Sequence, residues 1–435
     1  MKRSPFFIKM FIYFPYEKKG LLSLLLFIFI GFSLYAQETY RTECKDTRFR
    51  TLTVRNSSNW LLPPMIQLGG NEFIHIDFDL FDEKSERLYY SITHCNADWT
   101  PSDLNETEYI EGMNDREVEQ CEGSFNTYAN YFHYRLTLPN ARTAFTLSGN
   151  YVVKFYSPSN PDEVFLIACF YVYENSVSVS AAVSGNTDIS FNQGEQQVSL
   201  SISHPDLEIA NPEEDLKIYV IQNHRPEQRR YVQNPMIISP TLLSYTHYPH
   251  LIFEGGNEFR RFEVLSYSQA GLNVDYIGYD APYYSASLMP SESRLGKPYI
   301  YDKDQNGKFL VLCSNSSNPD TEADYLKVRF FYPTDLPFLN GKLYVYGELT
   351  GYKILPQYEM CYDVQAKSYV GELFLKQGAY NYIYVVVPKN EPNRFSSVME
   401  GNHWETENEY LTIVYYHPIG EKYDRIIGVN VVHTQ

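Results

Sequence analysis

The sequence predicts an all-β protein made of two to three β-sandwiches in series. Aromatic residues make up 16% of the 435 positions, with 40 Tyr and 27 Phe, and such side chains favour strands. Short runs in which apolar and polar residues alternate recur along the chain, as expected of strands with one buried face. Turn residues separate the runs, and amphipathic helix patterns are scarce.

A basic, then apolar segment opens the chain. Lys and Arg residues precede the apolar run Leu21–Leu34, which is too short for a comfortable membrane span, and Tyr35-Ala36-Gln37 follows it. This order is typical of a signal peptide, which we place at residues 1–36 with cleavage after Ala36. An uncleaved anchor is the alternative. Either interpretation implies export, and no later stretch is apolar enough for a membrane helix.

The first expected sandwich covers residues 37–175. Ile74–Leu80 (IHIDFDL) alternates strictly, and Tyr134–Leu138 does the same. The apolar run Phe165–Glu174 is expected to form its last strand. We therefore expect one wet and one buried face in each of the two alternating strands.

The second unit is expected at residues 176–333. Val198–Ile202 and Leu326–Phe330 alternate with a period of two, which predicts strands. Several prolines between them predict long loops, and Gly255-Gly256-Asn257 predicts a turn.

The third unit is expected at residues 334–435, and it is rich in tyrosine. Its rhythm of strands, including Leu343–Leu349 and Asn408–Tyr416, is similar to the immunoglobulin-like early-set domains, some of which bind glycans. Trp404 is the candidate platform for stacking on a sugar. The alternative, which we favour, is that these aromatic residues pack the sandwich or form a protein interface.

Charge and cysteine content narrow the classes of function. The formal net charge of -17 would repel nucleic acids and anionic membrane surfaces. The six cysteines form no CxxC pair, so we expect no disulfide scaffold and zero or one bridge.

The segment His94–Trp99 (HCNADW) concentrates side chains that carry chemistry. In a strand His94, Asn96 and Asp98 share a face, which suggests a metal site or a nucleophilic Cys95. A zinc site needs a partner motif and a nucleophile needs a base, and neither stands out in the sequence. We favour a structural interpretation, in which a strand runs into a polar turn and Trp99 plugs the sandwich edge.

A second acidic motif, Asp302–Gly307 (DKDQNG), matches the first half of a calcium-binding EF-hand loop. The twelfth position of that loop should hold a bidentate acid, but it is Cys313 here, and a strand pattern follows instead of a helix. A hairpin around Asn306-Gly307 explains these residues better.

Long segments resemble a known family. HCNADWTPSDL, SFNTYANYFHYRLTLPN (Ser124–Asn140) and LIFEGGNEFR (Leu251–Arg260) look like hallmarks of the type IX secretion system plug proteins of Bacteroidota. The resemblance runs in order over the expected mature chain. It marks ten hallmark residues as structural or partner-facing: His94, Asn96, Asp98, Trp99, Asn126, Tyr134, Gly255, Gly256, Asn257 and Phe259.

The resemblance implies a non-enzymatic periplasmic protein without catalytic residues, cofactor or metal. Such a plug closes the periplasmic mouth of the outer-membrane translocon barrel of the type IX system when no cargo is engaged. The expected partner is that barrel, without nucleic acid, direct lipid binding or a small-molecule ligand. The alternative function is a glycan-binding periplasmic or surface β-sandwich module, and a hydrolase using His94, Cys95 or Asp98 is the third hypothesis.

Overall fold

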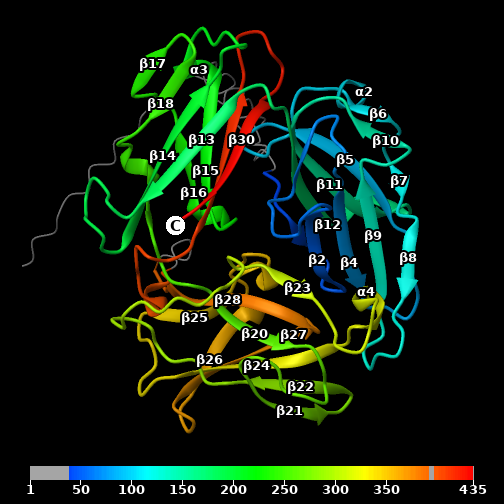
Figure 1. The fold of residues 1–435 in the computed structure, drawn as a ribbon. Coiled ribbons are helices and arrows are strands. Elements are labelled where there is room, and N and C mark those ends of the chain that lie inside the picture. Colours follow the sequence, from blue (N-terminus) through cyan, green and yellow to red (C-terminus); the bar gives the residue numbers. More distant parts are fainter. Residues whose placement is uncertain (1–38, 391–395, 435) are drawn as a thin grey trace, which may run out of the picture. The chain divides into compact units, whose positions relative to one another are not determined.

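The computed structural model describes residues 39–390 and 396–434, so the expected signal peptide at residues 1–36 lies outside the described residues. The described residues from Tyr40 onward form one compact unit. Within the described part the fold is all-β, as predicted, and its α-helices have only four residues each. We group the strands into first, second and third β units by the sheets that they form (Figure 1).

The first β unit consists of two sheets that share a core. Tyr90 and Phe155 from one sheet and Ile76 and Phe78 from the other belong to the same buried cluster, so the sheets pack face to face. The first sheet has the order β1 (Glu43–Cys44), β12 (Asn160–Tyr173), β11 (Gly149–Ser157), β5 (Tyr89–Cys95) and β7 (Arg116–Glu117), with β3 (Met65–Gln67) parallel to β12. The second has the order β2 (Phe49–Asn56), β4 (Ile74–Leu80), β9 (Phe132–Leu138) and β8 (Gln120–Gly123). A ribbon of β6 (Ile110–Gly112) and β10 (Thr143–Phe145), and helix α2 (Glu106–Tyr109), lie in the connections.

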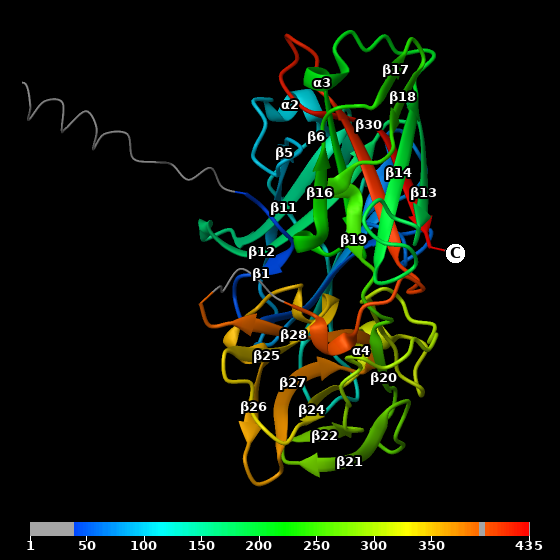
Figure 2. The same cartoon turned by 90° about the vertical axis from the view of Figure 1, so that its left-hand side faces the viewer.

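The second β unit also has two sheets, and one of them is completed by the C-terminal strands. The first sheet has the order β13 (Ser178–Ser184), β14 (Glu195–Ser203), β18 (Leu242–Tyr245) and β17 (Ile237–Ser239), with β19 (Ile252–Glu254) on β14. The second has the order β16 (Arg229–Val232), β15 (Leu216–Gln222), β29 (Glu409–Tyr416) and β30 (Arg425–His433). Short helical turns are α3 (Pro212–Asp215), η1 (Pro226–Gln228) and η2 (Pro249–Leu251). Figure 2 shows the red strand β30 among the green strands of this unit.

The third β unit is a nine-stranded sheet that folds over on itself. Phe262 on one end of the strand order contacts Phe330 near the other end, with ring centroids 5.6 Å apart, and both belong to one core. The order is β20 (Arg260–Val264), β28 (Gly378–Pro388), β25 (Gly341–Tyr346), β26 (Glu359–Asp363), β27 (Ser368–Lys376), β24 (Tyr325–Pro333), β22 (Tyr283–Leu288) and β21 (Val274–Asp280), with β23 (Phe309–Val311) on β28. Short helical turns are α4 (Pro319–Glu322), η3 (Glu348–Thr350), η4 (Pro356–Tyr358) and η5 (Val398–Glu400).

Strand pairing departs from the expected series at residue 334. The run Asn408–Tyr416, expected in the third unit, forms β29 and pairs with β15 of the second unit. Leu326–Phe330, expected in the second unit, lies in β24 and pairs with β27 of the third. The third β unit is thus inserted between β19 and β29 of the second. The expected units were drawn from neighbouring stretches of sequence. A β-strand, however, can pair with a strand that is far away in the chain, as β29 does with β15. The domain limits and the immunoglobulin-like type of the sandwiches stay predictions.

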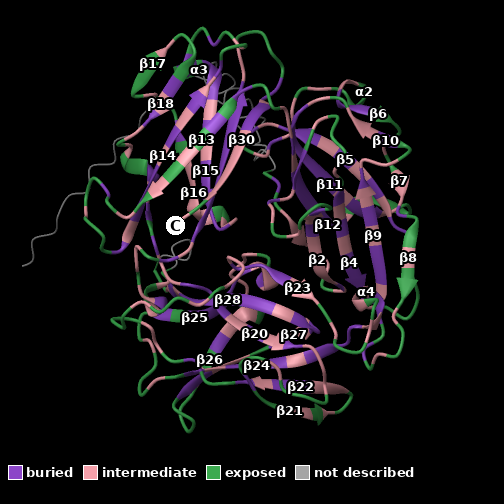
Figure 3. Cartoon of the chain, in the orientation of Figure 1, coloured by how far each residue is buried: buried purple, intermediate pink, exposed green. Residues whose placement is uncertain are grey.

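The alternating runs form strands as predicted. Ile74, Ile76 and Phe78 on β4 are buried, whereas His75 and Asp77 between them are only partly buried. Figure 3 shows the buried strand interiors of all three β units in purple, with the exposed edge strands β8 and β17 in green. Asn306 and Gly307 do form a turn, with φ of 50° and 84°. The strand after it, β23, pairs with β28 and not with a preceding strand, so the expected hairpin is wrong.

Candidate functional site at the joints between the β units

His94 is held by two hydrogen bonds inside the first β unit. Its Nε2 donates to the carbonyl oxygen of Ser148 at 3.0 Å, and its Nδ1 lies 2.9 Å from the hydroxyl of Ser102. Gly149, with φ of +148°, leaves the space for the ring, because a Cβ there would lie 2.1 Å from Nε2. Burial lowers the pKa of His94 to about 4. A neutral imidazole with both nitrogens engaged acts as a packing group.

The turn after His94 joins the first β unit to the second. The backbone N–H of Ala97 donates to Oδ2 of Asp424 at 2.8 Å, and its carbonyl accepts from Nη2 of Arg229 at 2.5 Å. Asn150 on the neighbouring strand donates to the Asn96 carbonyl at 2.8 Å and accepts from the Tyr415 hydroxyl at 2.7 Å. The polar half of HCNADW therefore closes a joint between two units.

Asp98 and Trp99 shape this turn. Oδ1 of Asp98 accepts from the N–H and the hydroxyl of Thr100 at 3.0 and 2.6 Å, while the residue itself is exposed. Trp99 has a φ of +67°, and its partly buried ring lies 5.2 Å from that of Tyr171. Trp99 packs against a buried cluster that includes Cys95, Val152 and Ile167 of the same sheet, so it serves the packing of the first β unit.

The second hallmark segment joins the first β unit to the third. Asp324, which is buried, accepts the N–H of Tyr128 at 2.8 Å and that of Ala129 at 3.0 Å. The hydroxyl of Tyr131 donates to the Ala323 carbonyl at 2.7 Å. Asn126 is exposed, with a φ of +58°, so it serves the bend of this loop.

Tyr134, at the end of the same hallmark, has a different role. Its ring stacks on Phe78 with centroids 5.3 Å apart, and its hydroxyl donates to the Glu86 carbonyl at 2.6 Å. It is therefore a core residue of the first β unit and does not face a partner.

The first–third joint also contains a buried charge network that the sequence analysis missed. The carboxylate of Asp79 on β4 accepts from Nζ of Lys376 at 2.6 Å and from the Tyr325 hydroxyl at 2.7 Å. On its other oxygen it contacts Nδ1 of His133 at 2.8 Å. Burial alone would lower the pKa of His133, but the carboxylates of Asp77 and Asp79 raise it to about 9. The pattern of β4 hid Asp79, because the alternation indicated a polar side chain facing water.

The third hallmark segment joins the second β unit to the third. The N–H of Gly256 donates to Oδ1 of Asn402 at 2.8 Å, and the Asn257 amide donates to the Glu400 carbonyl at 2.8 Å. Gly255 fits because a Cβ would lie 2.1 Å from the His403 carbonyl oxygen. The chain passes from the second β unit to the third near Gly256 and returns near Asn402. Hydrogen bonds join these two connecting segments to each other.

A buried ion pair continues this joint into the third β unit. Arg260 lies with Nε 3.0 Å from both carboxylate oxygens of Glu400, and both residues are buried. Phe259 is 3% exposed, and its ring fills the space beside Gly307, where a Cβ would lie 2.6 Å away. Its N–H donates to Asp304, so the acidic motif at 302–307 supports the joint. Burial raises the pKa of Asp304 to about 7, which disfavours a calcium ligand there.

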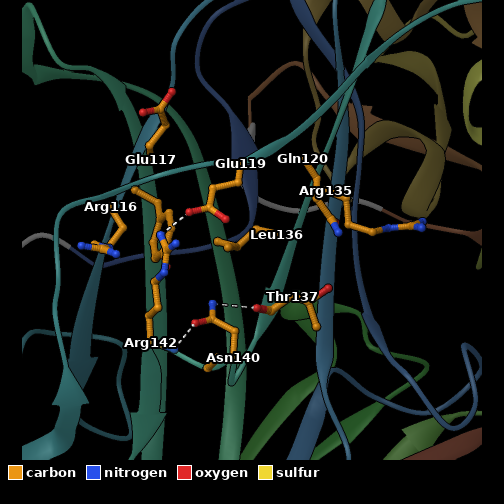
Figure 4. Close-up of a pocket in the computed structure, with 11 residues that line it drawn as sticks. Arg116, Glu117, Glu119, Gln120, Arg135, Leu136, Thr137, Asn140 and Arg142 are labelled. Atoms are coloured by element: carbon orange, nitrogen blue, oxygen red, sulfur yellow. Dashed lines mark hydrogen bonds and ion pairs between the residues drawn. The ribbon is translucent and has the colours of Figure 1, made fainter.

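The other candidates for chemistry have structural surroundings. Trp404 packs against Gly185, where a Cβ would meet its ring at 2.4 Å, so this face is not open to a sugar. The pocket in Figure 4, about 190 Å³ in volume, is lined by Arg116, Arg135 and Arg142. Arg142 pairs with Glu119 and Arg135 with Asp77, so two of its three guanidinium groups are already neutralised.

The described residues contain no metal-binding group, membrane-spanning helix or disulfide. No group of three or more His, Cys, Asp or Glu side chains in that part is arranged to hold a metal ion. None of its helices has the length and apolar character needed to cross a membrane. No disulfide joins any of the six cysteines, all of which lie in described segments.

Comparison with known proteins gives the family. The model of the type 9 secretion system plug protein 1st domain matches residues 49–174, which hold the first two hallmark segments. The chain belongs to the type 9 secretion system plug protein family. This membership supports involvement in type IX secretion.

A solved structure extends the likeness beyond the matched domain. A hypothetical protein from Parabacteroides merdae ATCC 43184 is 40% identical, with a TM-score of 0.88. The alignment covers 92% of this chain and 100% of that chain. No curated protein matches.

Proposed function

We propose that this plug-family protein closes the periplasmic side of the type IX translocon pore when no cargo is engaged. The observation that carries the proposal is the place of the three hallmark segments. HCNADW lies at the first–second joint, SFNTYANY at the first–third joint and LIFEGGNEFR at the second–third joint. Each pair of β units is thus fastened directly, and a pore seal needs a body that does not bend.

The interactions of the hallmark residues support a structural role and not a catalytic one. Where hallmark side chains are buried, they donate to or accept from backbone groups or pack in cores, and His94 is neutral in the physiological range. Family membership also suggests a non-enzymatic role. An envelope location fits the same family, and we propose the periplasm with export by the expected signal peptide.

Net charge suggests how the seal forms and releases. The chain carries 53 acidic and 36 basic side chains, which would complement a basic rim on the barrel. Contacts of this kind are weakened by salt because the Debye length falls to about 3 Å at 1 M ionic strength. We therefore expect the complex with the purified translocon to weaken as sodium chloride is raised, measured by surface plasmon resonance.

Deletion of the gene tests the proposal in cells. The outer membrane should become permeable to a large hydrophilic antibiotic when cargo is absent, because the barrel then stands open. Affinity purification from native membranes should recover the barrel together with the tagged chain. Complementation with the unaltered chain restores the barrier.

A matched control variant tests whether any surface substitution disturbs the seal. Lys342→Met removes an exposed ion pair with Glu359 that lies within the third β unit, so the variant should seal like the unaltered chain. Unchanged permeability after deletion, together with no copurifying barrel, would overturn the proposal.

A further inference from the structure

A cavity of about 400 Å³ opens between the first and third β units. Its walls come from β2, β4 and β9 on one side and from β23, Asp320 and Lys376 on the other. Binding sites for small molecules have volumes of about 300–1,000 Å³. The family resemblance implied no small-molecule ligand. Residues from such distant segments also show no common pattern in the chain.

The β2 wall of the cavity has an unusual backbone. Pairing between β2 and β4 shifts register between Arg50 and Thr53, which is a β-bulge. Thr51 within it has a φ of +54°, a strained value for a β-branched residue. Bulges re-aim side chains and occur preferentially beside functional sites. Here Thr51 and Thr53 both line the cavity, and the Thr51 hydroxyl is hydrogen-bonded to the Tyr325 hydroxyl.

An aromatic side chain stands at the same cavity. The guanidinium of Arg55 lies 5.9 Å from the ring of Trp60 and 5.7 Å from that of Phe309. Its Nη2 is also 2.5 Å from Oε2 of Glu348, so Arg55 is fixed on both sides. Trp60 is therefore braced, while it remains partly exposed at the cavity.

The charges around the cavity are already paired within the protein. Arg135 contacts Asp77 at 2.5 Å and Asp320 at 2.9 Å, and Lys376 contacts Asp79 at 2.6 Å. A charged ligand would compete with these pairs. A neutral ligand could donate hydrogen bonds to the remaining lone pairs of the paired carboxylates, since a carboxylate has about four acceptor positions.

Further polar side chains line the same space. Nε2 of His133 lies buried 3.5 Å from a carboxylate oxygen of Asp77, and the two form an ion pair beside the cavity. His75 uses its Nδ1 on Thr137, and it lines the cavity together with polar side chains of the segment before Trp60: Asn56, Ser57, Ser58 and Asn59. Hydroxyl, amide and imidazole groups beside one braced tryptophan match a molecule with an apolar C–H face and many hydroxyls.

We propose that this cavity binds a neutral carbohydrate of one or two sugar rings, with Trp60 as the stacking platform and Thr53, His75 and Asp77 as hydrogen-bonding groups. This site differs from the Trp404 platform expected from the sequence. It is independent of the pore-sealing function, because binding can be measured on the isolated protein.

Titration calorimetry of the purified chain tests the proposal. The probes are glucose, galactose and N-acetylglucosamine, their β-linked disaccharides, and glucuronate as the charged counterpart. We expect saturable binding of at least one neutral probe, weaker binding of glucuronate, and a loss of about tenfold or more in affinity for Trp60→Ala.

Two further variants keep the test sharp. Thr53→Val removes a hydroxyl with little change in shape, and it should weaken binding even if Trp60→Ala fails to fold. Trp404→Phe changes the other candidate platform and should leave affinity unchanged. No saturable binding of any neutral probe, tighter binding of glucuronate, or affinity that survives both Trp60→Ala and Thr53→Val overturns the proposal.

Discussion

At the scale of single residues, the position of a hallmark side chain can depend on a small neighbouring residue that leaves space for it. His94 needs Gly149, whose positive φ and missing Cβ allow the imidazole to reach the Ser148 carbonyl. Gly149→Ala should therefore destabilise the protein by about 3 kcal/mol, since both backbone strain and a clash are introduced. Denaturant unfolding measures the change.

Gly351→Ala is the control for Gly149→Ala. Gly351 has a φ of +60°, but a Cβ added there would meet nothing within 4 Å, so only strain is added. We expect a cost of about 1 kcal/mol there. Equal costs at the two positions would contradict the role of Gly149 in seating His94.

The pKa of His133 gives the second prediction at this scale. A folded pKa of about 9, raised above the usual 6.5, means that folding favours the protonated ring. Its contribution is fully present below pH 6.5 and is lost as pH rises through 9. The loss should be on the order of 3 kcal/mol.

Unfolding free energies between pH 6 and pH 10 check this dependence. His133→Gln should reduce the loss of stability over that window, because the amide does not titrate. Asp304 and Lys308, whose pKa values burial shifts to about 7 and about 8, still contribute to the curve. A curve that His133→Gln leaves unchanged would show that another group causes the loss.

At the scale of elements, strand type was readable from the sequence and strand partnership was not. Ile74–Leu80 and Val198–Ile202 show the period of two that a half-buried strand imposes, and both are strands. Asn408–Tyr416 is apolar on both faces, and β29 is buried along its whole length. Such a run indicates burial but does not name its neighbour, so its pairing with β15 could not be foreseen.

The same holds for the candidate sites: the sequence indicated the segments but not the residues that they contact. The hallmark segments were found by resemblance, whereas their partners Asp424, Asp324 and Glu400 lie far away in the chain. Each partner is an ordinary acidic residue in an acidic sequence. Only folding brings these carboxylates to the backbone or the guanidinium group that they bind, so the joints were invisible before the structure.

The second–third joint can be tested as an element. Arg260→Met leaves the buried Glu400 with only the more distant Arg294, 3.8 Å away, and should cost about 3 kcal/mol. The double variant Arg260→Met/Glu400→Leu should be less destabilised than Arg260→Met, because the Glu400 carboxylate is then no longer buried without Arg260. Chemical denaturation of the single and double variants gives the coupling energy.

An exposed ion pair serves as the reference for that cycle. The side chains of Lys297 and Glu292 are 52% and 79% exposed, so Lys297→Met should change stability by less than about 0.5 kcal/mol. Strict additivity of Arg260→Met and Glu400→Leu would mean that the pair does not fasten the two connections.

At the scale of the whole molecule, three β units fastened in all three pairings should unfold together. Asp324 holds the N–H groups of Tyr128 and Ala129 across the first–third joint. Asp324→Ala removes these charge-assisted bonds and should cost about 3–5 kcal/mol. With that joint loosened, calorimetry should resolve two transitions where the unaltered chain shows one.

The control for Asp324→Ala is a buried aspartate whose bond stays inside one unit. Asp215 accepts the N–H of Asn211 at 3.0 Å within the second β unit. Asp215→Ala should lower the transition temperature but keep a single transition, because no joint is cut. Two transitions in Asp215→Ala, or one in Asp324→Ala, would contradict a body held together by its joints. If the joints keep the three β units rigid, cells that carry Asp324→Ala should have a permeable outer membrane, although the variant still copurifies with the barrel. A protein with one loosened joint can bind the rim of the barrel without closing the pore.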